Sequence, residues 1–434
     1  EGGSYLYPRV DWREDTSGYV EMELPLLSWL GALSYHVFGY REEILRIWSS
    51  FFSAGSMVLF AWLAWRVVAP LGALVATAVF ATNGLLITTS SAIQPESPML
   101  CFSIAAMLAS DHWIKTDRKG SFLLGCLLVG VAACCKGPAV HLGFVLLFYV
   151  LWKRGLIGSL LDPIAWLGAA IAGGLPLLWY SWAHHFYLAT GLSLGLSNET
   201  HLISWQAVRD LSLLKTLIRV EVIDVFAGVG VFFAAAACWM NWKQAQFAFV
   251  WYVSVCLFYL ISLDTSGDAW AYYYHLISVP PAALLIGEGV SSILGVFASK
   301  PPRIRRVGIA TVSALTFVIV IGGCFRSTQF LLRKGGPGTQ EMFLAAQELA
   351  TYVPADGRIV IRGSTRLDAH GHRVAYHLSM PSTIDDISRR GGNYWIASES
   401  AIKENEFGAK LQSFEHLATS GRFRLYFVPS TDRQ

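Results

Sequence analysis

The stretch VVAPLGALVATAVFATNGLLITTSSAIQP, residues 67–95, runs for 29 residues without a formal charge, and Glu96 follows it directly. About 20 apolar residues are enough for a helix to cross the hydrocarbon core of a bilayer. The stretch therefore raises two questions: whether the whole chain spans a membrane many times, and why a carboxylate stands at the end of one span.

The composition of the chain answers the first question. Of 434 residues, 54% are hydrophobic and only 15% are charged. Further charge-free runs of 18 to 20 residues are found at 47–65, 225–242, 244–263, 269–287 and 307–325. We expect helices, because lipid offers no partner for an unpaired backbone group. A net charge of +3, without a basic block, excludes a nucleic-acid-binding protein.

The sequence predicts a mainly α protein, a polytopic membrane helical bundle with about ten spans over residues 44–325. The predicted helices are 44–66, 70–90, 96–114, 120–135, 138–152, 162–182, 216–240, 244–263, 271–298 and 306–325. Residues 1–43 precede them as a loop, in which Leu24–Gly39 is apolar but short and is expected to lie at the membrane interface.

The last part of the chain has a different character. Residues 326–434 contain 25 charged side chains in 109 and no run long enough to span. Helical and strand patterns alternate there, with strands expected in RIVIRG, NYWIAS and RFRLYFVP and helices between them. We expect a separate, small α/β domain.

The basic residues predict the orientation of the bundle. They cluster in alternate loops, around Lys115, Lys153, Lys243 and Lys300, and the positive-inside rule places those loops in the cytoplasm. The other connections, and the C-terminal domain, are then extracytoplasmic.

Two charges stand out at the predicted outer face. Glu96 lies between two prolines, where an acid is favourable at a helix start, so capping alone accounts for it. An acid at membrane depth is also costly and tends to line a polar cavity. Lys136 is the only charge between Gly120 and Trp152. It either marks a hairpin tip and reaches the interface, or it faces an anionic phosphate as a point charge.

The N-terminal loop adds further candidates. It carries seven charges within 15 residues, which are Arg9, Asp11, Arg13, Glu14, Asp15, Glu21 and Glu23. Most are expected to be solvated. Glu21 and Glu23 directly precede the interfacial stretch, and paired carboxylates there can activate a hydroxyl or hold a divalent metal.

Histidines and tyrosines end two helices on the same face. His184 and His185 enter the longest outer loop, and Tyr274 and His275 stand in AWAYYYHLISVPP. Interfacial aromatics are ordinarily belt residues, whereas histidines can also ligate metal or donate to phosphate. With Glu23, the pair His184 and His185 forms a candidate set of metal ligands.

The ordered set of these motifs resembles a known family. ELPLLSWL, LRIWSSFFS, QPE, CKGP, PLLWYSWAHHF and YYYHLISVPPAALL follow one another along residues 1 to about 325. This order resembles the GT-C superfamily of integral-membrane glycosyltransferases, specifically bacterial family 39 and 83-like enzymes related to protein O-mannosyltransferases and to the aminoarabinose transferases that modify lipid A.

The resemblance implies a fold and an activity. It implies a GT-C type bundle in the bacterial inner membrane that moves a sugar from a polyprenyl-phosphate carrier to a lipid, glycan or protein acceptor on the extracytoplasmic face. It implies catalytic roles for Glu96, Glu23 and Glu21. It also implies that the carrier phosphate meets Lys136. The charge, chemistry and outer-face position of Arg9, Arg13, His275 and Tyr274 make them further candidate contacts. The family's catalytic base, an aspartate after the first transmembrane helix, is expected upstream of Glu1.

Two other classes stay open from the sequence. A transporter or flippase of lipid-linked sugar would use the same charges as a substrate path, although we find no internal repeat of the kind many transporters show. A catalytically inert assembly subunit is the third class.

Overall fold

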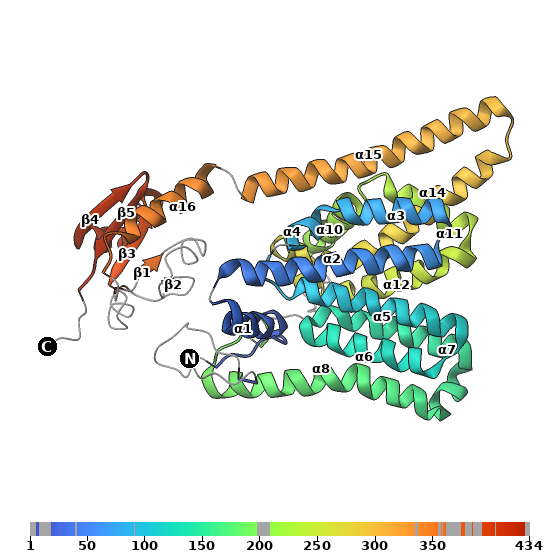
Figure 1. The fold of residues 1–434 in the computed structure, drawn as a ribbon, viewed down its shortest axis with the longest axis horizontal. Coiled ribbons are helices and arrows are strands. Elements are labelled where there is room, and N and C mark those ends of the chain that lie inside the picture. Colours follow the sequence, from blue (N-terminus) through green and yellow to red (C-terminus); the bar gives the residue numbers. More distant parts are fainter. Residues whose placement is uncertain are drawn as a thin grey trace. The chain divides into compact units, whose positions relative to one another are not determined.

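The computed structural model describes residues 6–7, 19–39, 41–90, 92–197, 209–334, 337–354, 357, 359–361, 375–377, 384, 393–403 and 405–429. The chain divides into two compact units. One, the membrane unit, takes in Val20–Phe330, and the other, the C-terminal unit, takes in Leu331–Gln434 (Figure 1). The sequence predicts the boundary between residues 325 and 326. Helix α15 continues through that position, from Pro302 to Lys334, and the two units divide within it, after Phe330.

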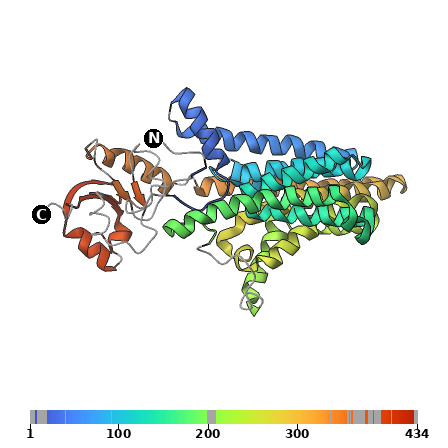
Figure 2. The same ribbon diagram turned by 90° about the horizontal axis from the view of Figure 1, so that it is seen from below.

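The membrane unit is entirely helical in its described elements, and its long helices run alongside one another in both views (Figure 1, Figure 2). In chain order these are α1 (Leu26–Phe38), α2 (Glu42–Val67), α3 (Pro70–Thr82), α4 (Gly84–Ser90), α5 (Glu96–Thr116), α6 (Lys119–Cys135), the 3₁₀ segment η1 (Gly137–Val140), α7 (His141–Leu161), α8 (Pro163–Thr190), α10 (Leu211–Val220), the π-helical turn η2 (Glu221–Val225), α11 (Gly230–Met240), α12 (Trp242–Ile261), α13 (Leu263–Ser266), the 3₁₀ segment η3 (Ala269–Ser278), α14 (Val279–Ala298) and α15 (Pro302–Lys334).

All ten predicted spans contain helix, but they do not all qualify as membrane-crossing helices. Among the described residues, six helices are long and apolar enough to cross a bilayer, or up to eight if each of two bent pairs counts as one span. The two that fall short are α5, whose second half carries Asp111 and His112, and α6, which is 17 residues long. The chain is a multi-pass membrane protein by this measure.

Two predicted spans are broken, so residues 70–90 and residues 216–240, each expected to form one helix, form a bent pair of helices instead. Helices α3 and α4 bend by 54° at Asn83, whose side chain accepts a hydrogen bond from the Leu85 amide at 2.9 Å and so caps α4. The second break is an 86° bend between Leu211–Val225 and α11. Ala227 and Gly228 have positive φ angles of 51° and 70° there, which no continuous helix accommodates.

The core of the membrane unit runs between α2, α3, α5, α6, α7, α11, α12 and α14. Helix α14 lies deepest, since its residues from Val279 to Val290 are all buried. It approaches α3 so closely that a Cβ atom on Gly72 would lie 2.6 Å from the Gly287 carbonyl oxygen. Glycine at this crossing replaces side-chain packing with direct backbone contact.

Ion pairs join several helices near one end of the bundle. Asp111 on α5 bonds Arg66 at the end of α2 and Lys115 at the end of α5, each at 2.8 Å. Lys153 on α7 bonds Asp117, directly after α5, at 2.9 Å. Lys115 and Lys153 belong to two of the basic clusters that the sequence predicts on one side of the membrane. Which side of the membrane they face stays a prediction.

The C-terminal unit is a five-stranded mixed sheet with helices. Its elements are α16 (Pro337–Ala350), β1 (Ile359–Ile361), β2 (Ala375–His377), β3 (Tyr394–Ser398), α18 (Glu399–Lys403), α19 (Asn405–Gln412), β4 (Glu415–Ser420) and β5 (Phe423–Phe427). The strand order is β2-β1-β3-β5-β4, with β1 parallel to both neighbours and β5 antiparallel to both of its own. The three predicted strands are β1, β3 and β5, and the sequence reasoning missed β2 and β4. One of the helices expected between these strands, STIDDISRR at residues 382–390, lies outside the described residues except for Ile384.

Candidate active site

Three of the predicted site residues meet at the end of the bundle opposite the Asp111 ion pairs. The Lys136 ammonium lies 3.0 Å from Glu23 Oε1 and 3.2 Å from Glu96 Oε1. The three side chains are 12%, 14% and 3% exposed, in the order Lys136, Glu23 and Glu96. Residues 113 positions apart in the sequence thus form one buried cluster, which we call the Lys136 site.

Local structure explains how each side chain reaches the Lys136 site. Glu96 is the first residue of α5 and follows Pro95, as expected for an acid at a helix start. Lys136 follows the last residue of α6 in an extended conformation, with φ −159° and ψ 129°. The loop that carries Glu23 is fixed beside it, because the Leu24 amide donates to the Cys134 carbonyl oxygen at 2.8 Å.

Two tyrosine rings from η3 complete the surroundings of the lysine. The Lys136 ammonium lies 5.5 Å from the centroid of the Tyr273 ring and 5.7 Å from that of Tyr274. Both distances fall within the roughly 6 Å over which a cation is attracted to an aromatic face. The predicted contact Tyr274 therefore belongs to the site, and Tyr273 joins it.

The Lys136 site holds more negative than positive charge. Burial disfavours the charged ammonium, but the neighbouring Glu96 and Glu23 carboxylates outweigh it and raise the pKa of Lys136 above its usual value. Two carboxylates share this one cation. Among the described residues, Glu96 Oε2 is buried and has no hydrogen-bond partner. A buried oxygen left in this state is costly, which indicates a place for a ligand.

A cavity opens beside the Lys136 site. Its volume is about 280 Å³. Its lining includes Glu23, Pro138, Tyr180, Thr265 and Tyr274. It thus combines one of the two carboxylates with aromatic rings and a hydroxyl group, as is typical of a small-molecule site.

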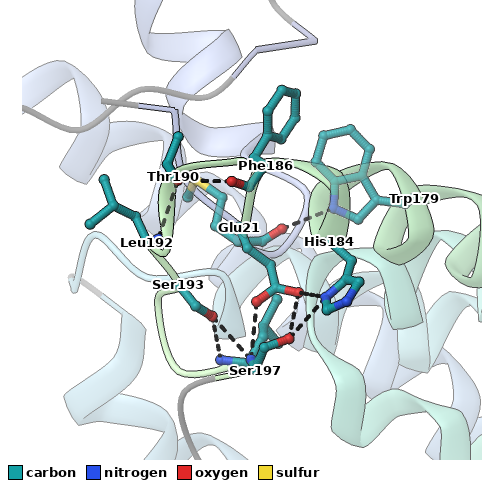
Figure 3. A network of polar contacts seen from close by, with 10 residues as sticks. Glu21, Trp179, His184, Phe186, Thr190, Leu192, Ser193 and Ser197 are labelled. Atoms are coloured by element: carbon teal, nitrogen blue, oxygen red, sulfur yellow. Dashed lines mark hydrogen bonds and ion pairs between the residues drawn. The ribbon is translucent and has the colours of Figure 1, made fainter. Parts of the chain in front are cut away.

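Glu21 lies elsewhere, in a second polar network (Figure 3). Its Oε1 contacts His184 Nδ1 at 2.9 Å and accepts from the Ser197 hydroxyl at 2.8 Å, while Oε2 accepts from the Ser197 amide at 3.0 Å. The backbone of Glu21 also pairs with Leu192 and Leu194. This network clasps the N-terminal loop to the segment after α8, and we call it the Glu21 clasp.

The Glu21 clasp contains a serine, a histidine and a carboxylate, but it is no hydrolytic triad. A triad needs the serine on one imidazole nitrogen and the acid on the other. Here Ser197 Oγ and Glu21 Oε1 both contact Nδ1 of His184, at 3.0 and 2.9 Å. Burial opposes the charge of Glu21, but the hydrogen bonds from Ser193, His184 and Ser197 lower its pKa below the usual value. The clasp holds a fully bonded carboxylate.

His275 belongs to a third network, which the sequence reasoning missed. Its Nδ1 lies 2.6 Å from Glu221 Oε1, and its Nε2 lies 3.1 Å from the Ser266 carbonyl oxygen. Glu221 also accepts from the Tyr252 and Ser278 hydroxyls, at 2.7 and 2.8 Å. Both ring nitrogens of His275 are thus engaged inside the protein. The available signal was Glu221 itself, an acid inside a range expected to span as a helix.

The remaining predicted residues do not join the Lys136 site in the described residues. His185 stacks on Trp182 with ring centroids 6.2 Å apart. Arg9 and Arg13 lie outside the described residues. The candidate metal ligands are not brought together, since Glu23 bonds Lys136 whereas His184 bonds Glu21. In the described part of the chain, no three His, Cys, Asp or Glu side chains are grouped so that they could hold a metal ion.

The chain is similar to one known sequence family and to several solved structures. Residues 23–182 match the sequence profile of the dolichyl-phosphate-mannose-protein mannosyltransferase family. No curated protein sequence matches the chain significantly. The crystal structure of ArnT from Cupriavidus metallidurans in the apo state superposes with a TM-score of 0.58 at 15% identity, over 96% of this chain and 90% of ArnT.

The chain has the GT-C fold. The structure of the same ArnT bound to undecaprenyl phosphate gives a TM-score of 0.57 at 14% identity, over 94% of this chain and 88% of that one. The GT-C bundle that the sequence predicts is thereby confirmed as a fold, and the mixed sheet of the C-terminal unit agrees with the predicted α/β domain.

Proposed function

We propose that this GT-C chain is a glycosyltransferase that moves a sugar from a polyprenyl-phosphate carrier to an acceptor on the extracytoplasmic face of the membrane. The observation that carries the proposal is the Lys136 site. It is a buried cation beside a cavity, at one end of a membrane bundle, with an unpartnered carboxylate oxygen next to it. A lipid-linked donor accounts for a site at this position, because its tail stays in the bilayer while its head enters the cavity.

Lys136 is assigned to the carrier phosphate. Its ammonium has three donors, and the Glu23 and Glu96 oxygens at 3.0 and 3.2 Å accept from it in this structure. A phosphate adds negative charge to a cluster that already holds two carboxylates and one cation. Binding therefore requires that the phosphate displaces one carboxylate from Lys136 or that a carboxylate takes up a proton.

The reaction breaks the bond between the sugar C1 atom and the phosphate oxygen, and the phosphate leaves with the bonding electrons. A cation placed where that charge develops is worth several kcal/mol in a site that excludes water, on the order of the effect of an oxyanion-hole donor. Lys136 supplies that cation. The acceptor oxygen bonds to C1, and its proton passes to a base.

Glu96 and Glu23 are assigned to hydroxyl groups. Glu96 Oε2 has no partner within the described residues, so it can accept a hydrogen bond from a sugar or acceptor hydroxyl. A carboxylate displaced from Lys136 gains the same capacity. No step is assigned to a metal, because the described His, Cys, Asp and Glu residues offer no cluster of three ligands.

The location belongs to the same proposal. The basic ends of α2, α5 and α7 lie together, which supports a cytoplasmic placement of that end by the positive-inside rule. The Lys136 site and the C-terminal unit would then face outward, from a bacterial inner membrane.

A transfer assay tests the proposal. The full chain in nanodiscs receives radiolabelled polyprenyl-phosphate sugars and candidate lipid, glycan and peptide acceptors. We expect transfer that is lost in Lys136→Ala and strongly reduced in Glu96→Gln, but retained in Lys153→Ala, which removes a lysine at the other end of the bundle. Activity that persists in Lys136→Ala would contradict the assignment.

One observation favours a transporter as the second candidate. Discontinuous helices are common at transporter binding sites, and this bundle has breaks of 54° and 86°. The assay separates the two, because a flippase would move a labelled carrier lipid between leaflets without forming a glycosidic bond. Movement without transfer in wild-type vesicles would favour the transporter.

A further inference from the structure

A second cavity lies where the two broken spans meet helix α15. It has a volume of about 280 Å³. Its polar lining comes from three places: Asn83 and Thr88 beside the first break, Asp224 in η2, and Arg326 on α15. Tyr272 of η3 closes another side. None of the side chains that the sequence predicts for the site lines this cavity.

The backbone groups exposed by the two breaks are bonded within the protein. Asn83 Nδ2 donates to the Asp224 carbonyl oxygen at 3.0 Å, and Arg326 donates to the Ile223 carbonyl oxygen. The Ser327 hydroxyl donates to the Thr82 carbonyl oxygen at 3.2 Å. Irregular backbone at membrane depth is tolerated where it lines a cavity and is satisfied in this way. The cavity is therefore a built feature of the helix breaks.

The charges of this cavity cancel. Arg326 Nη1 lies 3.1 Å from Asp224 Oδ1, and the two side chains are 44% and 45% exposed. The remaining polar groups are hydroxyls and an amide, set among apolar residues such as Val79 and Ile319. This balance contrasts with the Lys136 site, where two acids share one cation.

One segment forms a wall of both cavities. Tyr272 of η3 lines the second cavity, whereas Tyr274 lines the cavity beside Lys136. The segment is held by the 2.6 Å contact between His275 and Glu221, and Glu221 lies one turn before Asp224. Two residues of η3 that lie two positions apart thus line two cavities of the same membrane unit.

We infer that the second cavity takes the neutral, hydroxyl-rich head group of the acceptor, a sugar or polyol carried on a lipid. This inference rests on the proposed transfer, which needs a second reactant beside the donor. A hydroxyl group both donates and accepts hydrogen bonds, and a carboxylate, a guanidinium and an amide together offer acceptors and donors for it. The cancelled charge favours a neutral ligand over an anion. The volume lies just below the range of about 300–1,000 Å³ for ligand pockets, so it suits a single small head group.

A pair of matched leucine substitutions tests the assignment. Gly84 lines the cavity, and a Cβ there would lie 3.7 Å from Ser327 Oγ, which is ordinary van der Waals contact, so Gly84→Leu places a side chain at the cavity without a clash at Cβ. The control Gly174→Leu adds the same side chain to an apolar groove between α6 and α8, where a Cβ meets no atom within 4 Å. The probes are radiolabelled octyl glucoside, octyl phosphate and undecaprenyl phosphate, bound to the full chain in nanodiscs.

We expect Gly84→Leu to weaken octyl glucoside binding by about tenfold or more, as filling a pocket does, and to leave undecaprenyl phosphate binding unchanged. Gly174→Leu should leave octyl glucoside binding unchanged. Octyl phosphate binding that Gly84→Leu weakens as much as it weakens octyl glucoside binding would overturn the neutral-ligand assignment, because phosphate bound at Lys136 does not depend on the second cavity. Equal losses of octyl glucoside and undecaprenyl phosphate in Gly84→Leu would overturn a separate acceptor cavity, as would octyl glucoside binding that Gly84→Leu does not change.

The same experiment separates the inference from the proposal on which it rests. If undecaprenyl phosphate fails to bind the wild-type chain, the proposed lipid-phosphate donor is contradicted. The octyl glucoside result still decides whether the second cavity binds a hydroxylated head group.

Discussion

Helix α5 carries a buried acid near each end, and the two acids differ in the number of partners that they bond. Asp111 bonds two cations, Arg66 and Lys115, each at 2.8 Å. Glu96 shares the single cation Lys136 with Glu23, at the longer distance of 3.2 Å, and its second oxygen has no partner among the described residues. Both side chains are 3% exposed, so burial does not distinguish them.

The difference between these acids separates structure from function. A buried charge whose partners are complete stabilises the helix ends that it joins. A buried carboxylate oxygen without a hydrogen-bond partner costs stability in the absence of a ligand, and its place in a polar cluster marks a candidate binding site. Glu221 has three hydrogen-bond partners, so it resembles Asp111 rather than Glu96 in this respect.

The largest expected effect comes from Lys136→Ala. The substitution leaves two buried carboxylates without a cation, which costs about 3–5 kcal/mol of folding stability when a buried pair loses one member. Thermal unfolding in nanodiscs measures it. The triple variant that adds Glu23→Gln and Glu96→Gln should recover most of the stability without recovering sugar transfer. Recovery of transfer in the triple variant would contradict a phosphate role for Lys136.

Glu96→Gln and Asp111→Asn compare the two acids directly. Glu96→Gln removes excess negative charge from the Lys136 site, so we expect little loss of stability but a fall in sugar transfer of roughly 100-fold. Asp111→Asn should cost about 1 kcal/mol, because Arg66 and Lys115 are partly exposed, and should leave transfer within about twofold. Initial rates at matched amounts of folded protein measure both. Equal rates in the two variants would remove the distinction.

Tyr274→Leu tests the aromatic surroundings of the cation. The ring centroid lies 5.7 Å from the Lys136 ammonium, and a partly desolvated cation–π contact is worth about 1 kcal/mol, or roughly fivefold in an equilibrium constant. We expect donor affinity to fall by that factor. Tyr187→Leu, outside the Lys136 site, is the control, and an equal loss there would show a general packing effect.

Glu21→Gln is expected to affect stability and its pH dependence. The hydrogen bonds of the Glu21 clasp lower the carboxyl pKa from 4.5, so their stabilisation is present above that value and is lost as pH falls through the lowered pKa. At neutral pH the variant should lose about 1–3 kcal/mol. Unfolding from pH 7 to pH 3 measures the difference, which should shrink at the acidic end. A difference that grows on acidification would contradict the direction of the shift.

Much of the fold could be predicted because hydrophobic length dictates helices in a membrane. The ten expected ranges all contain helix. Glu96 and Lys136 were identified as isolated charges beside apolar runs, and Glu23 as an acid directly before the interfacial stretch. The break at Asn83 was missed although Asn83 and Gly84 form a turn dipeptide, because the 29-residue charge-free run favoured one continuous helix. Its side chain acts by capping α4 and bonding Asp224, 141 residues away.

Partners are harder to predict than positions. Glu21 and Glu23 looked equivalent in the sequence, yet one joins the Glu21 clasp and the other joins the Lys136 site, because the chain that holds them pairs with Leu192 on one side and Cys134 on the other. His275 looked like a phosphate contact, and only the folded chain brings Glu221 to it. Such pairings depend on long-range packing, which no local pattern encodes.

The central claim is that the lipid phosphate binds at Lys136, and undecaprenyl phosphate affinity tests it most directly. Lys136→Gln and Lys115→Gln each remove a lysine from a buried acid of α5, at opposite ends of the helix. We predict that affinity measured on the folded chain in nanodiscs falls at least about tenfold, or 1.4 kcal/mol, in Lys136→Gln and is unchanged in Lys115→Gln. Unchanged affinity in Lys136→Gln, or an equal loss in both variants, would contradict the claim.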